Sequence, residues 1–425
     1  MLPWVIRAAA MRPDRLAVVD DHERLTYAEL EARARRAAGA LAQRGIRQGD
    51  HVALALPAGA QFCAALHGCM LLGAVAVPID LRLAAEERRV RARTAKILVE
   101  EPLDGPPIEA THDPDPAEVA ALMHTSGTTA APKPVSLSYG NWLASALGSA
   151  VALGLDQAER WLCPMPLAHV GGLSILLRSA VYATTAIVHS RFEPEKVTAA
   201  LTDPTGAATM ISLVATMLDR LLDAGLREPP ALRWALLGGG PIPSSLLERA
   251  RAQGVPVAPT YGMTEACSQI ATFGWPLPGV ELQISARGEV LVRGPMISKL
   301  ALAQDGWLHT GDLGALDASG RLNLRGRLSE VIVTGGENVA PAEVEDALLA
   351  HPAVADAAVY GRPDAEWGEA VIAAVVLRDG LAVDPEELKI HCAQRLARFK
   401  VPKEFKFTQG LPRTASGKLV RRELA

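Results

Sequence analysis

The sequence predicts an α/β protein, because short, continuously apolar strands alternate with helical segments along most of the chain. In the first hundred residues the apolar runs VALALP, AVAVPI and AKILVE are separated by helical stretches. The alternation resumes with ATTAIVHS, ATMISLV and LRWALLGGG, and we expect helices at 194–202, 214–225 and 243–253. Strands that are apolar throughout indicate a parallel sheet with both faces covered.

The N-terminal part also carries clear helix signals. From Leu25 the pattern LTYAELEARARRAAGALAQRG has helical spacing, with Thr26 as N-cap and Gly45 as terminator. The longest apolar stretch, residues 63–79, is interrupted by a histidine, two glycines and a proline. It therefore predicts a buried helix followed by a strand and not a membrane span.

The pattern of alternating strands and helices ends near Gly274. GVELQISARGEVLVRG predicts a β-hairpin with Gly288 at its turn, and short strands continue to Arg327. EVIVTGGEN, a helix from Pro341, two further apolar runs and a helix at 385–398 then predict a small α+β domain.

Composition bounds the class of protein. A chain of 425 residues that is 49% hydrophobic and 21% charged can bury a large core and form more than one domain. Its net charge of −4 gives no global attraction to nucleic acid or to an anionic membrane, so any anionic substrate must be held by local cations. Five scattered cysteines without zinc-ligand spacing fit a reducing compartment. The first residues meet arginine and proline too early for a secretory segment, so we expect a cytoplasmic protein.

The stretch MHTSGTTAAPKP, residues 123–134, is the strongest functional signal. Small hydroxylic and glycyl residues leave the backbone N–H groups uncovered, and Lys133 follows at once, as in a phosphate cradle. A solvated linker is the alternative, since small polar runs are common loop material. The pattern differs from a nucleotide-binding P-loop, because Lys133 is followed by Pro134 and not by Ser or Thr.

Three further motifs follow strands or turns. Glycines at 238–240 follow the strand LRWALL, and there a flat ring or a phosphate can approach the backbone. A plain strand-to-helix turn would have the same sequence pattern. YGMTE, residues 261–265, offers an aromatic face, a hydroxyl and a carboxylate that can hold Mg²⁺, whereas a lone carboxylate there is more often a surface residue. TGD at 310–312 places a carboxylate in what we expect to be a tight turn, where it usually caps its own backbone. Lys418, near the chain end, would by itself be interpreted as an ordinary surface residue.

The order of these pieces carries more information than any single one. TSGTT...PK, GGGP, YGMTE, TGD, GR, GGEN...P.EVE and PRTASGK occur in this sequence over essentially the whole chain. This succession resembles the adenylate-forming acyl- and aryl-CoA synthetase superfamily. The resemblance implies two stacked α/β subdomains plus a β-subdomain over residues 1–326 and a small mobile α+β domain over residues 327–425, and it implies ATP, Mg²⁺ and coenzyme A as co-substrates and cofactor.

The resemblance also implies roles for single residues. The ATP-binding residues would be Thr125, Ser126, Gly127, Thr128, Thr129, Lys133, Gly238, Gly239, Gly240, Tyr261, Gly262, Met263, Thr264, Asp312 and Arg327. Glu265 with Thr128 would hold magnesium, and Lys418 would bridge the substrate carboxylate and the α-phosphate. Gly335, Gly336, Glu337 and Asn338 would border the thiol channel, and Ser329 and Glu330 would form the hinge. The family loop usually reads TSGTTGxPKG, so Ala130 and Pro134 are departures that stiffen it.

Two blocks indicate the subgroup. PMPLAHVGGLSILLRSAVYATTAIVH and the segment ending YGMTEACSQI resemble the o-succinylbenzoate-CoA ligases of menaquinone synthesis. His169 would then approach the acyl carboxylate, with Gly171, Arg178 and Gln269 also at the substrate. Such a dicarboxylate needs a cation for the carboxylate that is not activated, which favours Arg178. The alternatives are a core histidine satisfied by backbone and an arginine on the solvent side of a helix.

The resulting expectation is a two-step, AMP-forming ligation of 2-succinylbenzoate to coenzyme A through an acyl-adenylate. A ligase for another aryl or fatty acid, a carrier-protein-loading enzyme and a non-catalytic nucleotide-binding relative are the alternatives. The expected partners are a small carboxylic acid, ATP and CoA, with no nucleic acid and no membrane. The sequence leaves open whether the chain forms a homodimer.

Overall fold

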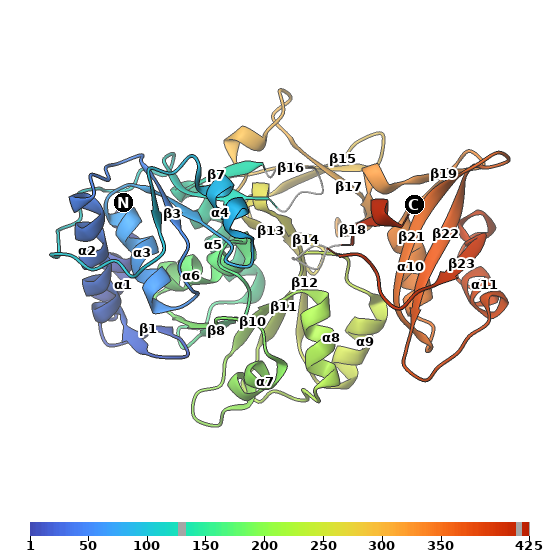
Figure 1. Cartoon of the computed structure of the whole chain (residues 1–425), viewed down its shortest axis with the longest axis horizontal. Helices are drawn as coiled ribbons and strands as arrows, with labels where there is room; N and C mark the ends of the chain where they lie inside the picture. Colours follow the sequence, from blue (N-terminus) through green and yellow to red (C-terminus); the bar gives the residue numbers. More distant parts are fainter. Residues whose placement is uncertain (126–132, 414–418, 425) are drawn as a thin grey trace. The chain divides into compact units, whose positions relative to one another are not determined.

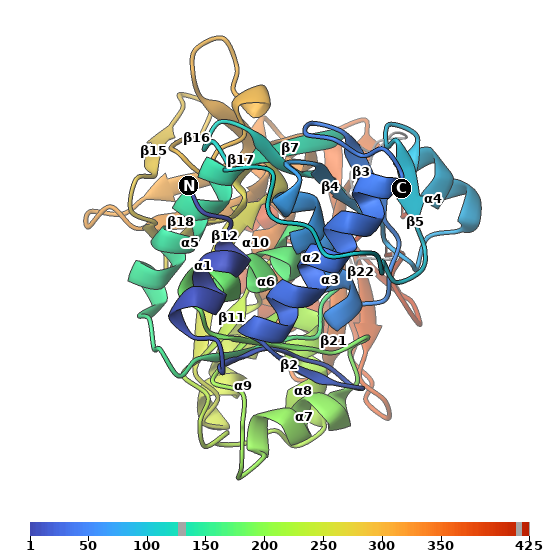
Figure 2. The same ribbon diagram turned by 90° about the vertical axis from the view of Figure 1, so that its left-hand side faces the viewer.

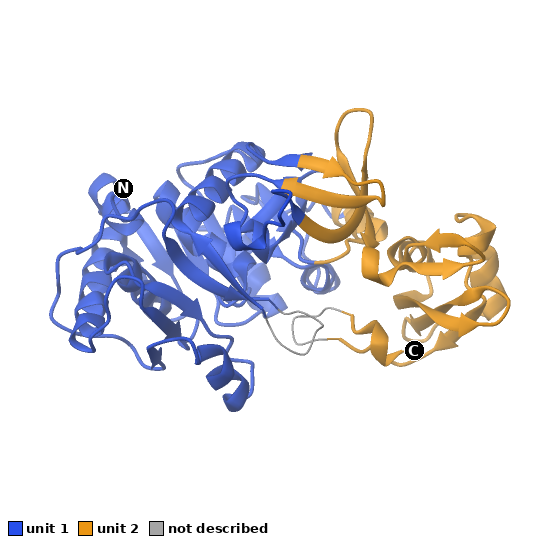
Figure 3. Cartoon of the chain, turned by 90° about the horizontal axis from the view of Figure 1, so that it is seen from above, with its two compact units in different colours: residues 1–239, 253–281, 293–308 blue, residues 240–252, 282–292, 309–425 orange. Residues whose placement is uncertain are grey.

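The computed structural model describes residues 1–125, 133–413 and 419–424. These residues form two compact units (Figure 3). The first comprises residues 1–239, 253–281 and 293–308, and the second comprises residues 240–252, 282–292 and 309–425.

The first unit contains a nine-stranded sheet. In spatial order its strands are β14 (Trp275–Pro276), β13 (Ser268–Thr272), β12 (Val257–Met263), β11 (Trp234–Leu237), β10 (Met210–Leu213), β8 (Arg160–Cys163), β9 (Thr185–Val188), β1 (Leu16–Val19) and β2 (Arg24–Thr26). The strands from β12 to β1 run parallel, and antiparallel strands close both edges. All four residues of β9 and of β10 are buried, as a parallel sheet covered on both faces requires.

A second sheet of the same unit has five strands. Their order is β5 (Ile97–Val99), β3 (His51–Leu54), β4 (Val75–Pro78), β6 (Val119–His124) and β7 (Pro134–Ser138). The first four are parallel, and β7 returns antiparallel to β6.

Helices fill the space between these two sheets. They are α1 (Trp4–Met11), α2 (Tyr27–Gln43), α3 (Ala60–Leu71), α5 (Tyr139–Leu153) and α6 (Val170–Tyr182). Helix α3 packs on β3 and β4 of one sheet and on β1 of the other, and α5 packs on β7 and β13. Figure 2 shows α1, α2 and α3 side by side in this layer. The remaining helices of the unit are α4 (Ala85–Ala92), α7 (Pro194–Thr202), α8 (Ala215–Asp223), η1 (Thr264–Ala266) and η2 (Lys299–Ala301).

The helix signals of the sequence are confirmed. Thr26 caps α2 in a capping box, since its hydroxyl accepts from the Glu29 N–H and the Glu29 carboxylate accepts from the Thr26 N–H. The apolar stretch 63–79 forms most of α3 and then β4, and α7 and α8 lie where they were expected.

The second unit contains two sheets. One has the order β15 (Glu281–Ile284), β16 (Glu289–Arg293), β17 (Leu308–Leu316) and β18 (Leu322–Arg327). The other has the order β20 (Glu337–Val339), β19 (Ile332–Thr334), β22 (Gly368–Leu377) and β21 (Val354–Asp364), with β23 (Glu404–Phe407) parallel to β22. The helices are α9 (Ser244–Ala252), η3 (Leu328–Glu330), α10 (Pro341–Leu349), α11 (Pro385–Ala393), η4 (Arg398–Lys400) and η5 (Arg421–Glu423). Figure 1 shows α10 and α11 beside the β21–β22 pair.

The second unit confirms the hairpin at Gly288 and corrects one expected helix. Strands β15 and β16 are hydrogen-bonded neighbours, and Gly288 between them has a φ of 79°. The helix expected at 385–398 ends at Ala393, and η4 follows after a turn. The apolar spacing that predicted one long helix is real, because Leu396 and Phe399 pack on the same core as α11. A turn followed by a 3₁₀ segment brings these apolar side chains to the core as well as a continuous helix would.

Candidate active site

The candidate residues of the first unit gather at one edge of the nine-stranded sheet. Strands β8, β10, β11 and β12 are parallel neighbours, so their carboxyl ends meet at the same edge. Gly238 follows β11, residues 261–263 end β12, and the segment after β8 leads to His169. This is the edge at which open α/β sheets bind ligands.

Close backbone approach explains the glycines at 238 and 239. A Cβ on Gly238 would lie 2.8 Å from Cγ2 of Thr260, and Gly239 has a φ of 83° with Val214 Cγ1 at 3.2 Å. No larger side chain fits at Gly238 without displacing β12, because a carbon contact under 3.0 Å is repulsive. The two glycines therefore keep this part of the edge free of side chains.

The phosphate-cradle stretch lies between two strands. Thr125 directly follows β6, and its N–H and hydroxyl donate to the Lys133 carbonyl at 3.1 and 3.3 Å. The expected roles of Ser126, Gly127, Thr128 and Thr129 lie outside the described residues. Lys133 is exposed, and β7 begins at the next residue.

His169 has neighbours that sequence reasoning missed. Its side chain is 32% exposed, and its Nε2 lies 3.0 Å from a guanidinium nitrogen of Arg82 and 3.6 Å from Asp80 Oδ2. Arg82 also pairs with Asp80 at 2.6 Å. Burial opposes ionisation of Asp80, but the hydrogen bonds from Arg82 hold the pKa of Asp80 below its ordinary value. The available signal was position, since both residues lie within four residues of the end of the apolar strand β4.

Arg178 is a buried cation. It is 2% exposed on α6, lies over the Trp161 ring at 5.6 Å and donates one hydrogen bond of 3.1 Å to Ser145 Oγ. Its Nε has no hydrogen-bond partner, and no carboxylate pairs with it among the residues that the structure describes. Burial accordingly lowers the pKa of the guanidinium. The alternative of an arginine on the solvent side of a helix is wrong.

Gln269 and Gly171 lie on elements that pack against each other, β13 and α6. Gln269 is 1% exposed and donates to Thr272 Oγ1 at 2.8 Å, but its Oε1 has no partner in the described part of the chain. A Cβ on Gly171 would meet Met165 Cε at 3.1 Å in the first turn of α6. Buried polar atoms are normally hydrogen-bonded, so the unpaired Oε1 is an acceptor left for a ligand or a water.

The backbone fixes Glu265 after β12. Its carbonyl accepts the Ser298 N–H at 2.8 Å, and Thr264 accepts the Cys267 N–H at 3.0 Å. No ion-pair partner of the Glu265 carboxylate occurs within residues 1–125, 133–413 and 419–424, and no cluster of three or more His, Cys, Asp or Glu residues that could hold a metal occurs there. A single carboxylate suits Mg²⁺, which is commonly held by one or two carboxylates together with substrate phosphates.

In the second unit the structure brings Asp312 and Arg327 together. Asp312 lies 7% exposed in β17 opposite Arg327 of β18, and Arg327 Nε is 2.8 Å from Asp312 Oδ1. The expectation of a tight turn at TGD is wrong, since Thr310, Gly311 and Asp312 all belong to the strand. Gly311 has a φ of 68°, a left-handed conformation within the strand that glycine adopts without strain.

Gly335 and Gly336 form the turn between β19 and β20. Their φ values are 58° and 81°, and Thr334 pairs with Glu337, as in a two-residue type I′ hairpin. The Gly335 N–H donates to the Trp367 carbonyl at 2.8 Å, and a Cβ on Gly335 would lie 3.1 Å from the indole. The turn thus presents bare backbone beside an aromatic ring. Glu337 and Asn338 are exposed at the start of β20.

Ser329 and Glu330 lie in η3, directly after β18. Glu330 is bound at 2.6 Å by the Arg421 guanidinium.

Lys418 lies outside the described residues. In the described part of the chain no helix is both long and apolar enough to cross a lipid bilayer.

Family models match most of the chain. The model described as AMP-binding enzyme matches residues 5–100 and 98–300, and the model described as AMP-binding enzyme C-terminal domain matches residues 343–418.

Similar proteins cover the full length. The 2-succinylbenzoate–CoA ligase of Bacillus licheniformis is 39% identical, with 99% of this chain and 98% of the relative covered. The alignment is 475 positions long, so this chain of 425 residues lacks segments that the relative has. The o-succinylbenzoate CoA synthetase from Bacillus subtilis in complex with the acyl-adenylate intermediate OSB-AMP has a TM-score of 0.91 at 38% identity, with 99% and 97% coverage. The same enzyme in complex with ATP and magnesium ion has a TM-score of 0.91 at 37% identity, with 99% of each chain covered.

Proposed function

We propose, since this chain belongs to the family of AMP-binding enzymes, that it joins 2-succinylbenzoate to coenzyme A in an ATP-dependent, AMP-forming reaction. The observation that carries the proposal is the full-length similarity to 2-succinylbenzoate–CoA ligases combined with a buried cation, Arg178, that has no acidic partner in the described residues. A dicarboxylic acid supplies the missing anion.

The reaction has two steps. A carboxylate oxygen of the acid attacks the α-phosphorus of ATP, the bond to the bridging oxygen breaks, and pyrophosphate leaves. The carboxylate is a poor acyl donor, and adenylation gives it AMP as a leaving group. The CoA sulfur then attacks the acyl carbon, AMP departs, and the thiol proton is released to solvent.

The chain's own residues supply binding and orientation. We assign Thr125 to Thr129 and Lys133 to the β- and γ-phosphates, Gly238 to Gly240 and Tyr261 to adenine, and Thr264 to the α-phosphate. Gly262 and Met263 are assigned to ATP binding. Asp312 and Arg327 would hold the ribose, and their ion pair fixes the carboxylate of Asp312 on the β17–β18 ladder. Lys418 is assigned to the negative charge that develops between the carboxylate and the α-phosphate.

His169 is assigned to the reacting carboxylate. Arg82 has only N–H donors and lies 3.0 Å from Nε2, which favours a neutral imidazole that accepts at Nε2 and carries its proton on Nδ1. Arg82 therefore orients the ring, and Asp80 balances the charge of Arg82. Gly171, Arg178 and Gln269 complete the proposed acid site.

Magnesium, when bound with ATP, would neutralise phosphate charge during pyrophosphate departure. Glu265 suits this ion because its carboxylate has no competing ion pair in the described residues. Thr128 is the second assigned ligand.

We further propose that residues 327–425 move as a domain relative to residues 1–326 between the two steps, with Ser329 and Glu330 as the hinge. Gly335 to Asn338 are assigned to the passage of the CoA thiol, where the bare turn beside Trp367 admits a narrow chain. We place the protein in the cytoplasm, which agrees with five buried cysteines that are all free thiols. A homodimer is also proposed.

Measuring thioester formation with a panel of acids tests the function. The purified protein, ATP, Mg²⁺ and CoA are combined with 2-succinylbenzoate, benzoate or octanoate, and acyl-CoA and AMP are quantified. We expect kcat/KM for 2-succinylbenzoate to exceed the others at least about 100-fold, since only it supplies a second carboxylate for a buried cation. A higher kcat/KM for benzoate or octanoate would reject the substrate assignment.

A further inference from the structure

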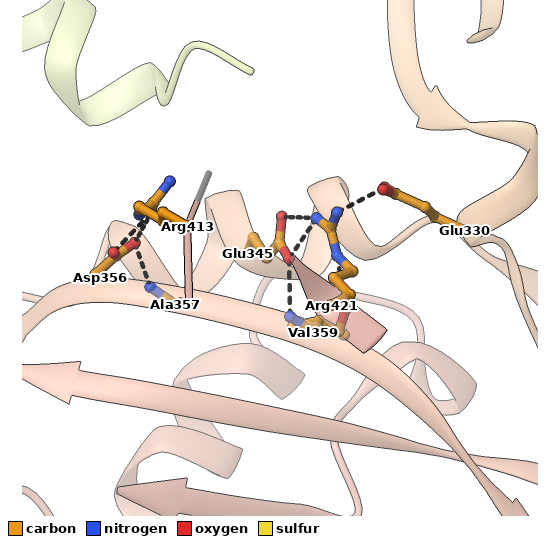
Figure 4. Close-up of polar contacts among 7 residues, drawn as sticks. All are labelled: Glu330, Glu345, Asp356, Ala357, Val359, Arg413 and Arg421. Atoms are coloured by element: carbon orange, nitrogen blue, oxygen red, sulfur yellow. Dashed lines mark hydrogen bonds and ion pairs between the residues drawn. The ribbon is translucent and has the colours of Figure 1, made fainter. Parts of the chain in front are cut away.

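Two arginines hold the chain on either side of residues 414–418, and both are bound to the same strand, β21 (Figure 4). On one side, Arg413 donates to both carboxylate oxygens of Asp356 at 2.9 and 2.7 Å. On the other side, Arg421 donates from Nε to the Val359 carbonyl at 3.1 Å. The two anchors lie three residues apart on β21.

Arg421 has the richer set of partners. Its guanidinium binds both oxygens of Glu345 at 2.8 Å and one oxygen of Glu330 at 2.6 Å, so every nitrogen of the group has an acceptor. Glu345 is 7% exposed on α10, and its Oε1 also accepts the Val359 N–H at 2.8 Å. Burial raises the pKa of Glu345, and Arg421 opposes that shift. A charged group in this position requires a fixed partner, and only a planar fork reaches all three acceptors at once.

Backbone pairing and apolar packing hold the same residues. Arg413 and Leu419 form an antiparallel bridge, and the Val420 N–H donates to the Pro412 carbonyl at 2.9 Å. Leu411, Leu419 and Leu424 pack against the outer face of the β21–β22 pair. The residues flanking 414–418 are therefore held to one sheet by charge, by backbone and by apolar contact.

We propose that Arg421 is a positioning residue for the adenylation step. This inference rests on the proposed function, in which Lys418 meets the charge between the carboxylate and the α-phosphate. Only Leu419 and Val420 separate Lys418 from Arg421 in the sequence, so the chain cannot span more than about 11 Å between them. By fixing residues 419–424 to β21 and α10, Arg421 sets the point from which the chain reaches the reacting atoms.

The contact with Glu330 gives this anchor a second consequence. Glu330 belongs to η3, the proposed hinge, and Glu345 belongs to α10, the helix that follows the β19–β20 hairpin. One guanidinium thus ties the C-terminal segment to the hinge and to the body of the small sheet. The segment should move with the hinge and not independently of it.

Half-reaction kinetics on Arg421→Gln, Arg421→Lys and the neighbouring control Arg422→Gln test this assignment. Arg422 carries the same charge on the next residue but is exposed. Adenylation is followed by ATP–pyrophosphate exchange with 2-succinylbenzoate, and the second step by thioester formation from supplied acyl-adenylate. Each substitution is repeated in the Lys418→Ala background, and thermal unfolding is recorded for every variant.

We expect Arg421→Gln to lower kcat for exchange about 10- to 100-fold, with KM for ATP nearly unchanged, because small misplacements of a reacting group have effects of that size. Thioester formation should change by less than about threefold, Arg421→Lys should recover part of the exchange rate, and Arg422→Gln should match the wild type. In the Lys418→Ala background Arg421→Gln should cause no further loss, since a residue that acts only through Lys418 has nothing left to position.

Equal losses in both half-reactions, or a full additional loss in the Lys418→Ala background, would overturn the assignment. If Arg421→Gln does not fold, Arg421→Lys decides, because it keeps a cation beside Glu345; wild-type exchange in that variant would leave Arg421 a purely stabilising residue. The proposed function fails differently, through absent exchange in the wild type or unchanged exchange in Lys418→Ala.

Discussion

Replacing Arg178 by methionine separates the effect of the buried charge on stability from its effect on catalysis. The guanidinium donates one side-chain hydrogen bond, to Ser145, and has no acidic partner in the described residues. Such a charge is costly to desolvate, so Arg178→Met should leave the free energy of unfolding unchanged or raise it. Ser145 keeps the 2.6 Å bond that it donates to the Cys267 carbonyl, and no buried donor loses its acceptor.

The effect on catalysis should have the opposite sign. A hydrogen bond to a charged group contributes about 1.5–3 kcal/mol, which corresponds to about 10- to 150-fold in kcat/KM. We expect that loss with 2-succinylbenzoate. The matching analogue keeps the carboxylate that is adenylated and lacks the other one. With this analogue, kcat/KM of the wild type and of Arg178→Met should differ by less than about threefold, because no anion then meets the cation.

Steady-state kinetics with both acids and thermal unfolding without ligand provide the measurement. Arg178→Lys serves as the matched control, since it keeps the charge and removes the planar fork, and it should retain part of the discrimination. Equal losses with the dicarboxylate and the monocarboxylate, or a strongly lowered Tm in Arg178→Met, would show that Arg178 has a structural role only.

Three further variants test Lys418, the turn at Gly335 and the ionisation of Glu159. Lys418→Ala should abolish most ATP–pyrophosphate exchange but leave thioester formation from supplied acyl-adenylate intact, and equal loss in both would reject its role. Gly335→Ala should cost about 1 kcal/mol or more from its left-handed backbone and slow thioester formation, whereas Gly380→Ala, at a φ of 75° with open space around it, should share the stability cost only. Burial raises the pKa of Glu159 from 4.5 to about 7. Between these two pKa values the folded state binds an extra proton, so the free energy of unfolding should fall as the pH rises from about 4.5 to about 7. If Glu159 causes this fall, the difference in free energy of unfolding between the wild type and Glu159→Gln changes with pH over that range. If another group causes it, that difference stays constant.

The elements that the sequence predicted well are those with local causes. Thr26 is the expected N-cap, and the structure adds Glu29 to form a capping box, which needs only the backbone of these two residues. The apolar strands of the large sheet were predictable because a parallel strand buried on both faces leaves a continuous apolar run. The type I′ turn at Gly335 and Gly336 was not predicted, because the sequence analysis assigned these residues only to the thiol channel.

The contacts that the sequence did not predict depend on distant segments. Asp80 and Arg82 lie almost ninety residues from His169, and nothing in their local sequence names that partner. Asp312 was expected in a turn because Thr-Gly-Asp is turn-like locally, yet its pairing with β18 keeps it in a strand. Cross-strand pairing and the approach of the segment after β4 to His169 decide these positions, and neither is encoded in a short-range pattern.

We propose that this chain activates a carboxylate as an adenylate before it forms a thioester. A single-turnover experiment tests it most directly: excess protein is mixed with ATP, Mg²⁺ and 2-succinylbenzoate without CoA, quenched over time and analysed for nucleotides and acyl species. We predict that acyl-adenylate and pyrophosphate appear in equal amounts, and that added CoA converts the adenylate to thioester and AMP. Formation of ADP and phosphate, or thioester formation in which no adenylate can be trapped before CoA is added, would exclude activation through an acyl-adenylate.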